Sequence, residues 1–232
     1  MNEILSCREL VKSYGGPRAL DGVDLDLERG RIVGLLGPNG SGKTTLIKLI
    51  NGLIRPTSGL LLVAGMAPGS ETKKLVSYLP DTDYLPDWMT LRSLTRMFSD
   101  FYDDFDAAKA DEMLRALSLE PAARLKTLSK GNREKTQLVL TMSRRAELYL
   151  LDEPIGGVDP AARDYILRTI IGNYSENGTV LLSTHLISDV EPALDEVVFL
   201  KQGKVMLHAN ADEVREREGK SIDALFREVF AC

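Results

Sequence analysis

Apolar and polar residues alternate near the N-terminus in the manner of β-strands. Between residues 19 and 27, Val23, Leu25 and Leu27 are separated by acidic residues, which gives a period of two. That period is typical of a strand with one buried face. Residues 4–14 have a similar strand-forming composition. The pattern therefore predicts two β-strands at the start of the chain.

Strands and helices then alternate around a helical block. An apolar run at residues 32–36 precedes a glycine-rich loop and an apolar helix at about residues 43–53. Three successive helices are predicted at residues 93–105, 107–119 and 129–145. Further strands are predicted at residues 148–151, 179–183, 196–200 and 204–207, with a helix at about residues 161–177. Such alternation indicates a parallel sheet covered by helices, so we predict an α/β domain with a helical insertion.

The C-terminal segment at residues 212–230 mixes charges of both signs with a single apolar face. Leu225, Phe226, Val229 and Phe230 form that face. We predict that this segment is a helical cap on the sheet, and a solvated charged helix is the alternative.

Composition excludes several classes of protein. The chain has 232 residues, of which 44% are hydrophobic and 27% charged, as in an ordinary globular protein and unlike a disordered one. Its longest nearly apolar stretch, residues 60–67, is far shorter than the ~20 residues that a membrane helix needs. The net charge of −5 argues against a general nucleic-acid binder. The two cysteines, Cys7 and Cys232, form no metal-ligand pattern and are expected to be free thiols.

The glycine-rich loop carries the strongest chemical signal. It consists of Gly37, Pro38, Asn39, Gly40, Ser41, Gly42, Lys43 and Thr44. Glycines let backbone N–H groups converge on phosphate oxygens, and the helix that follows adds the partial positive charge of its N-terminus. Lys43 is placed to reach β- and γ-phosphates, and the Thr44 hydroxyl to ligate Mg²⁺.

Two carboxylates follow a second apolar run. Residues 148–151 predict a buried strand that delivers Asp152 and Glu153 at its C-terminal end, where ligands bind in open α/β sheets. Asp152 is predicted to hold Mg²⁺, and Glu153 to orient or deprotonate a water that attacks the γ-phosphate. An ordinary turn after a buried strand is the alternative, and the phosphate loop in the same chain argues against it.

Between these two segments lies a motif, Leu128-Ser129-Lys130-Gly131-Asn132, that by itself predicts only a helix N-cap at Ser129. Its position in the order of motifs adds more. In that order, nearly the whole chain resembles the nucleotide-binding subunit of an ABC transporter, an ATPase of the ATP-binding cassette class. The resemblance implies a P-loop NTPase core with a mixed, mainly parallel sheet, an N-terminal antiparallel β subdomain and a helical insertion. Residues 1–82 and 146–232 would form the core of a single cassette domain, and residues 83–145 its helical subdomain.

Seven landmarks carry the resemblance. They are Tyr14, the Walker A loop at residues 37–44, Asp81, the signature motif at residues 128–132, the Walker B strand at residues 148–153, the D-loop at residues 156–159, and His185. The resemblance implies that Tyr14 stacks on adenine, although an ordinary core or surface tyrosine is the alternative. It also implies that His185 is the switch histidine, whereas His208 is expected to be structural.

The resemblance assigns a role to each candidate residue. Catalysis would involve Lys43, Glu153 and His185. Nucleotide binding would involve Tyr14, Gly37, Pro38, Asn39, Gly40, Ser41, Gly42, Lys43, Thr44, Thr45, Ser129 and Gly131. Mg²⁺ binding would involve Thr44, Asp81 and Asp152.

The family also implies partners. Two subunits would pair head to tail, so that ATP on the Walker A loop of one is covered by the signature helix of the other. A homodimer is favoured and a related cassette subunit is the alternative. The pair would power an integral membrane transporter, an exporter rather than an importer, from the cytoplasmic face of the membrane, with ATP and Mg²⁺ as cofactors. A soluble cassette ATPase, for example in iron–sulfur cluster assembly, is the alternative.

Two departures from the family pattern bear on these roles. Lys130 and Asn132 replace the usual Gly and Gln of the signature motif, and residues 121–145 carry a basic surplus that either faces triphosphate or solvates a helix. Asp81 stands where the family usually has Gln. It is expected to bind Mg²⁺ through water and to act as a coupling position.

An aromatic cluster at residues 84–105 suggests a contact with the membrane partner. Tyr84, Trp88, Phe98, Phe101, Tyr102 and Phe105 lie within it, and the core of the helical lobe accounts for many of them. The resemblance implies a groove here for a short helix of the membrane partner. We therefore expect Trp88 or Met89 to be partly exposed in a groove next to Asp81.

Overall fold

The computed structural model describes residues 2–156, 158, 160–175 and 177–230. Its strands are β1 (Glu3–Ser13), β2 (Arg18–Glu28), β3 (Ile32–Leu36), β4 (Ser58–Val63), β5 (Val76–Leu79), β6 (Leu148–Asp152), β7 (Thr179–Thr184), β8 (Glu196–Lys201) and β9 (Lys204–Asn210). Its α-helices are α1 (Lys43–Ile50), α2 (Ser70–Leu75), α3 (Leu91–Phe101), α4 (Ala107–Ala116), α5 (Lys130–Met142), α6 (Pro160–Asn173), α7 (Ile187–Val190), α8 (Ala211–Glu218) and α9 (Ile222–Phe230).

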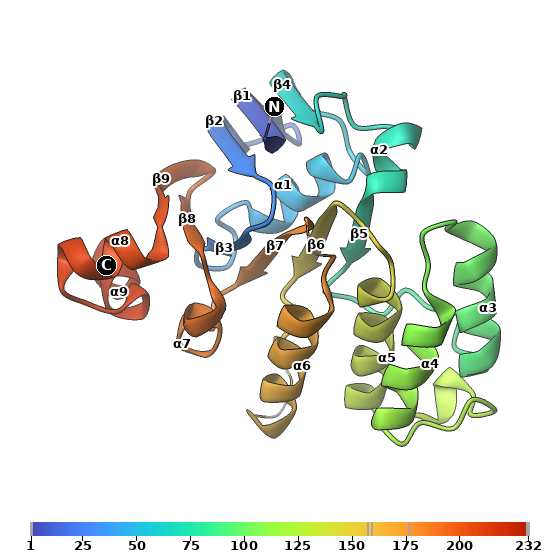
Figure 1. The fold of residues 1–232 in the computed structure, drawn as a ribbon. Helices are drawn as coiled ribbons and strands as arrows, with labels where there is room; N and C mark the ends of the chain where they lie inside the picture. Colours follow the sequence, from blue (N-terminus) through green and yellow to red (C-terminus); the bar gives the residue numbers. More distant parts are fainter. Residues whose placement is uncertain (1, 157, 159, 176, 231–232) are drawn as a thin grey trace.

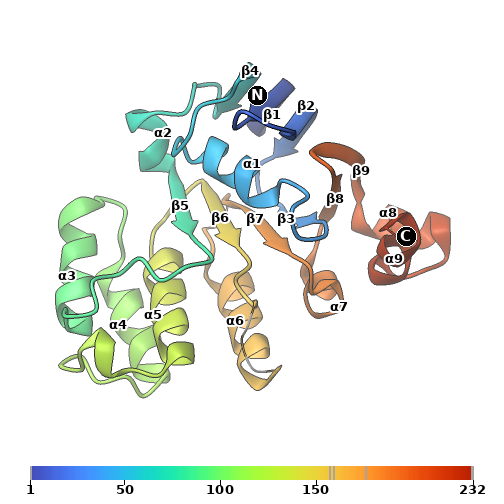
Figure 2. The same cartoon turned by 180° about the vertical axis from the view of Figure 1, so that it is seen from behind.

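Two sheets organise the described residues. The first is antiparallel with the order β2-β1-β4, and the second has the order β5-β6-β7-β3-β8-β9. Strands β5, β6, β7, β3 and β8 run parallel, and β9 alone pairs antiparallel at the edge. Figures 1 and 2 show α1 between the two sheets, the lobe of α3, α4 and α5 beyond the β5 edge, and α8 and α9 beyond the β9 edge. The predicted mixed sheet, antiparallel subdomain and helical insertion are therefore confirmed.

The central strands are apolar throughout because both of their faces are covered. In β6, Leu148 and Leu150 pack into the core shared with α1 and the antiparallel sheet. Tyr149 and Leu151 pack into the opposite core, which also holds the buried side chains of the helical lobe. This double burial is typical of parallel sheets. Parallel pairing with β5 and β7 sets the direction of the strand, whose C-terminal end carries Asp152.

Several elements were absent from the sequence prediction or begin elsewhere. Strands β4 and β5 and helix α2 were not predicted, because a strand of four residues is too short to show a period and half of the Leu60 side chain on β4 is exposed. Helix α3 begins at Leu91 rather than residue 93, since the Thr90 hydroxyl accepts the Ser93 N–H at 3.2 Å and caps it.

The predicted C-terminal cap is two helices rather than one. Gly219, with φ of 62°, ends α8 in the left-handed region before α9 begins. Phe226 and Phe230 of α9 pack against Phe199 of β8, so the apolar face does cover the sheet as expected. None of the described helices is both long and apolar enough to span a membrane.

Candidate active site

The phosphate loop is shaped by glycines that the surrounding chain requires. Gly40 and Gly42 have φ of 79° and 111°, in the region that side chains rarely adopt. A Cβ on Gly42 would lie 2.5 Å from the Ala19 carbonyl oxygen, and one on Gly37 would lie 2.4 Å from the Leu200 carbonyl oxygen. The loop is thus packed directly against the β2 and β8 backbones, and its shape is set within the chain.

Lys43, the first residue of α1, is buried in this loop. Only 6% of it is exposed, and its Nζ donates to the Gly37 carbonyl at 2.7 Å and lies 3.5 Å from Glu153 Oε1. The ammonium group is therefore held at the mouth of the loop and is compensated by one carboxylate. A phosphate group entering the loop would offer Lys43 a second, more highly charged partner.

Asp152 lies at the C-terminal end of β6, where only 1% of it is exposed. Its Oδ1 accepts hydrogen bonds from the Ser183 hydroxyl at 2.6 Å and the Thr44 hydroxyl at 3.2 Å, whereas its buried Oδ2 has no partner within the described residues. Burial raises the pKa of Asp152, and hydrogen bonds from Ser183 and Thr44 oppose that rise. An unpartnered carboxylate oxygen beside a hydroxyl fits a hard divalent cation such as Mg²⁺.

Glu153 turns out of the strand with a backbone that is strained for a side-chain-bearing residue. Its φ is 51°, and its N–H donates to the Ser183 hydroxyl at 3.1 Å. This turn directs the side chain between the Lys43 ammonium group and the His185 imidazole. Oε1 faces Lys43, and Oε2 lies 3.0 Å from His185 Nδ1.

The three predicted catalytic residues thus form one connected row, Lys43, Glu153 and His185. Lys43 begins α1 after β3 and its loop, and Glu153 and His185 directly follow β6 and β7. Strands β6, β7 and β3 are neighbours in the sheet. Ser183 joins this group by bonding both Asp152 and the Glu153 backbone. The sequence analysis had passed over Ser183, although the parallel pairing of Asp152 with Ser183 follows from adjacent strands that end together.

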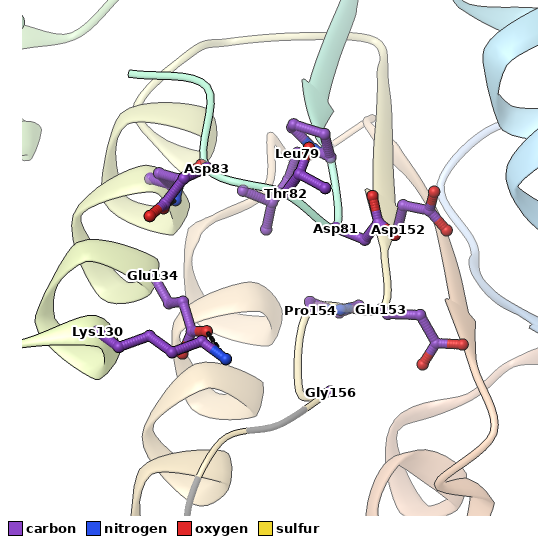
Figure 3. A pocket seen from close by; sticks show the side chains of 12 residues that line it. Leu79, Asp81, Thr82, Asp83, Lys130, Glu134, Asp152, Glu153, Pro154 and Gly156 are labelled. Atoms are coloured by element: carbon purple, nitrogen blue, oxygen red, sulfur yellow. Dashed lines mark hydrogen bonds and ion pairs between the residues drawn. The ribbon is translucent and has the colours of Figure 1, made fainter. Parts of the chain in front are cut away.

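A cavity of about 160 Å³ opens beside this group (Figure 3). Asp81, Asp152 and Glu153 lie on one side of it, with Lys130 and Glu134 of α5 on the other. The Asp81 side chain lies in the cavity wall and makes no hydrogen bond or ion pair with any described residue. Asp81 is therefore near Asp152, as a shared metal site would require, but contacts none of the predicted ligands.

The signature motif is not brought to the phosphate loop of its own chain. Ser129 caps α5 by accepting the Asn132 N–H at 3.3 Å, which agrees with the N-cap prediction. The side chain of Ser129 is exposed and has no other hydrogen bond among the described residues. A Cβ on Gly131 would meet no atom within 4 Å.

The remaining landmarks are placed in part. Tyr14 is 63% exposed, with Lys12 Nζ 4.9 Å from its ring centroid, so its ring face is partly open to solvent. In the D-loop, Gly156 and Val158 are described, whereas Gly157 and Asp159 lie outside the described residues. Thr45 follows Thr44 in α1, and His208 pairs with Glu196 at 2.9 Å across β8 and β9.

The expected groove exists, but its lining differs from the prediction. A cavity of about 320 Å³ between the sheet and the helical lobe is lined largely by apolar side chains, and Leu53, Tyr78, Pro80, Tyr84, Phe98 and Tyr102 are among its residues. Trp88 is 67% exposed, as expected, yet neither Trp88 nor Met89 lines this groove. The expectation that one of them would line this groove was wrong. Trp88 lies in an exposed turn closed by the Met89 N–H, which donates to the Pro86 carbonyl at 3.2 Å, and Met89 packs against the core of the lobe.

Comparisons with known proteins agree on the family. The family model described as ABC transporter matches residues 20–156. The ABC transporter ATP-binding protein YtrB of Bacillus subtilis (strain 168) is 31% identical, and the match covers 92% of this chain and 74% of YtrB. The daunorubicin resistance ATP-binding protein DrrA3 of Streptomyces coeruleorubidus is 30% identical, over 94% of this chain and 72% of DrrA3. A solved structure of an ATP binding subunit of an ABC transporter aligns with a TM-score of 0.86 at 30% identity, covering 97% of this chain and 99% of that one.

Proposed function

The chain belongs to the ABC transporter family of ATP-binding subunits, and from that premise we propose that it hydrolyses ATP to drive a membrane transporter. One observation carries the proposal: Lys43, Glu153 and His185 form a connected row beside the phosphate loop. A phosphate-binding cation, a carboxylate and an imidazole are the groups that attack on a γ-phosphate by water requires. The D-loop, whose Gly157 and Asp159 lie outside the described residues, carries no part of this argument.

Lys43 and Glu153 would separate their tasks when ATP binds. The Lys43 ammonium group, which lies 3.5 Å from Glu153 Oε1 in the structure, would bind the phosphates instead. Glu153, released from that contact, would accept the proton of the attacking water. His185, 3.0 Å from Oε2, would keep the carboxylate directed toward the γ-phosphate.

Thr44 and Asp152 are the residues that would hold Mg²⁺, and Asp81, on the same side of the cavity as Asp152, would contribute through water. Bound there, Mg²⁺ would neutralise charge on the phosphate oxygens. Ser183 fixes the Asp152 carboxylate with its 2.6 Å hydrogen bond, so the unpartnered Oδ2 is held in one orientation. Tyr14, whose side chain is largely exposed, would stack on the adenine ring.

We further propose that the complete site needs a second copy of the chain. Ser129 and Gly131 lie on an exposed helix start and contact nothing in their own phosphate loop. Placed against another copy, the N-terminus of α5 would direct its N–H groups toward a γ-phosphate bound there. In a head-to-tail pair, the α5 N-terminus of each copy would cover the γ-phosphate bound to the other copy.

The helical lobe at residues 83–145 would connect the ATPase core to the membrane partner. The groove lined by Leu53, Tyr84 and Tyr102 is partly apolar and opens at the junction of the lobe with β5. An amphipathic segment of a membrane subunit, on the cytoplasmic side of the membrane, suits such a groove. The resistance function in the name of DrrA3 favours export as the direction of transport.

The decisive experiment replaces Glu153. Glu153→Gln should lower the hydrolysis rate about 100-fold or more, because a general base contributes about that much, while Mg-ATP binding stays within about twofold. Glu147→Gln is the matched control, since Glu147 precedes the opposite end of the same strand and pairs with Arg29. Hydrolysis by Glu153→Gln at the wild-type rate would overturn the assignment of the base.

A further inference from the structure

One face of α5 is polar and is turned toward the cavity beside the active site. Lys130, Arg133, Glu134 and Gln137 lie at the spacing i, i+3, i+4 and i+7, which places them on one side of a helix. Three of them carry charge, and 97% of Gln137 is buried. A buried polar residue on this face requires a partner from the neighbouring segment.

That partner is Asp83, in the loop that follows β5. Gln137 Nε2 donates to Asp83 Oδ1 at 2.5 Å, and Arg133 Nη1 lies 3.2 Å from Asp83 Oδ2. One carboxylate therefore binds two successive turns of α5. Asp81, two residues earlier in the same loop, makes no such contact with any residue the structure describes.

For Arg133 and Gln137, the link to the loop rests on this one carboxylate. Gln137 Oε1 and Arg133 Nε are buried and have no partner in the described part of the chain, so each side chain is anchored only through Asp83. Lys130 Nζ lies 3.7 Å from Glu134 Oε1, and this ion pair joins two residues of α5 and makes no contact with the loop. Loss of the Asp83 carboxylate would leave Gln137 without any hydrogen-bond partner for its side chain.

We infer that Asp83 is a positioning residue for ATP hydrolysis, acting through the loop and helix that it joins. The loop carries Asp81 into the cavity with Asp152 and Glu153. The helix begins with the exposed segment of Ser129 and Gly131, one turn before Arg133. Asp83 therefore sets where the start of α5 stands relative to the reacting groups. The inference rests on the proposed function, since it assigns a role in that reaction.

The position of Asp83 predicts a split between binding and turnover. Asp83 contacts neither the phosphate loop nor Thr44, so nucleotide affinity should not depend on it. Turnover should depend on it, because displacing a catalytic element by about 1 Å can cost about 100-fold in rate. A merely structural residue would lower stability and leave the ratio of turnover to affinity unchanged.

The test compares Asp83→Ala and Asp83→Asn in the full chain, with Asp87→Asn as the control. The Asp87 side chain is in the same loop, is exposed, and has no hydrogen bond or ion pair among the described residues. We expect Asp83→Ala to lower kcat about 30-fold with the affinity for ATP within about twofold. The kcat of Asp83→Asn should lie between those of wild type and Asp83→Ala. The asparagine amide oxygen can still accept the hydrogen bond from Gln137, but the uncharged side chain no longer forms an ion pair with Arg133. Asp87→Asn should match wild type.

Amide hydrogen exchange provides a readout that is independent of hydrolysis. In Asp83→Ala, the amides of residues 81–84 and 129–134 should exchange faster, while those of β3 exchange as in wild type. Unchanged exchange in Asp83→Ala would overturn the link between loop and helix, whether or not the protein hydrolyses ATP. An inactive wild-type protein would instead contradict the proposed function. Faster exchange with wild-type kcat would overturn the positioning role. If Asp87→Asn lost as much kcat as Asp83→Ala, the positioning role would also be overturned, because the loss would then follow from the change in net charge alone.

Discussion

The glycines of the phosphate loop and the glycine of the signature motif differ in what requires them. A Cβ on Gly42 or Gly37 would collide with backbone oxygens of the same chain at 2.5 and 2.4 Å. A Cβ on Gly131 would meet nothing within 4 Å, and its backbone lies in an ordinary helix. The first two glycines are explained by the fold of this chain, whereas the third is not.

This difference teaches which half of the site the chain completes alone. Glycine in a helix costs up to about 1 kcal/mol relative to alanine, and no close contact with any described residue offsets that cost at Gly131. Close approach of another molecule, as in the proposed pairing of two copies, would explain a residue without a side chain at this position. The shape of the phosphate loop is thus explained by contacts within the chain, whereas the described residues give no reason for glycine at the start of α5.

The largest effect is expected at Gly42. Gly42→Ala combines a positive φ with a collision against the Ala19 carbonyl, so it should lower the free energy of unfolding by about 3 kcal/mol. The displaced loop should also lose ATP binding. Chemical denaturation and titration with a fluorescent ATP analogue measure both. Wild-type stability in Gly42→Ala would remove the contrast on which the comparison rests.

Gly131→Ala should have the opposite profile. We expect the free energy of unfolding to stay the same or rise by up to about 1 kcal/mol, because alanine favours the helix and has room. ATP binding by the single chain should be unchanged, whereas hydrolysis should fall about tenfold or more through the loss of contacts with a second copy. If Gly131→Ala hydrolyses ATP normally, the signature motif has no role in the reaction.

Mixing two inactive variants should sharpen the comparison. Lys43→Ala lacks a working phosphate loop and Gly131→Ala lacks a working signature motif, so a mixed dimer holds one intact site. An equal mixture forms about half mixed dimers, and hydrolysis should recover to about a quarter of the wild-type rate. Each variant alone is the control. Absence of recovery would contradict a site shared between two copies.

The smallest effect concerns the buried carboxylate of Asp152. Burial raises its pKa, so the ionised form weakens the nucleotide-free fold at neutral pH, and protonation relieves this cost as pH falls through the folded-state pKa. Asp152→Asn should therefore raise Tm at neutral pH, with a gain that shrinks toward acidic pH, and it should lose stabilisation by Mg-nucleotide. Asp87→Asn, at an exposed site, should show no such pH-dependent gain. Thermal unfolding across pH measures this, and an equal gain at every pH would contradict the argument.

Much of the catalytic half of the site was predictable because its parts are local in sequence. The phosphate loop, Asp152 and Glu153 each follow a buried apolar strand, and strand ends in a parallel sheet meet at one edge. His185 follows the next such strand. Ser183 was missed because nothing in its own segment distinguishes it, and only the pairing of β6 with β7 sets it against Asp152.

The lobe was less predictable, because its contacts with the core join distant residues. Asp83 and Gln137 are 54 positions apart, and no local pattern marks either as a partner of the other. Trp88 was expected in the groove because it is a large apolar residue near Asp81. The groove instead takes residues from both the lobe and the sheet, such as Leu53 and Tyr102, which come together only in the folded chain.

The sequence by itself determined the fold class, the phosphate loop and the row of strand ends, since backbone constraints and burial patterns act over a few residues. The tertiary structure alone decided which side chains share a charge or a hydrogen bond. It placed Lys43 beside Glu153 and left Oδ2 of Asp152 without a hydrogen-bond partner among the described residues. It also made Asp83, rather than Asp81, the residue that binds α5. The physical reason is range: propensity and period are properties of neighbours along the chain, whereas the distances between charged groups depend on how whole elements pack.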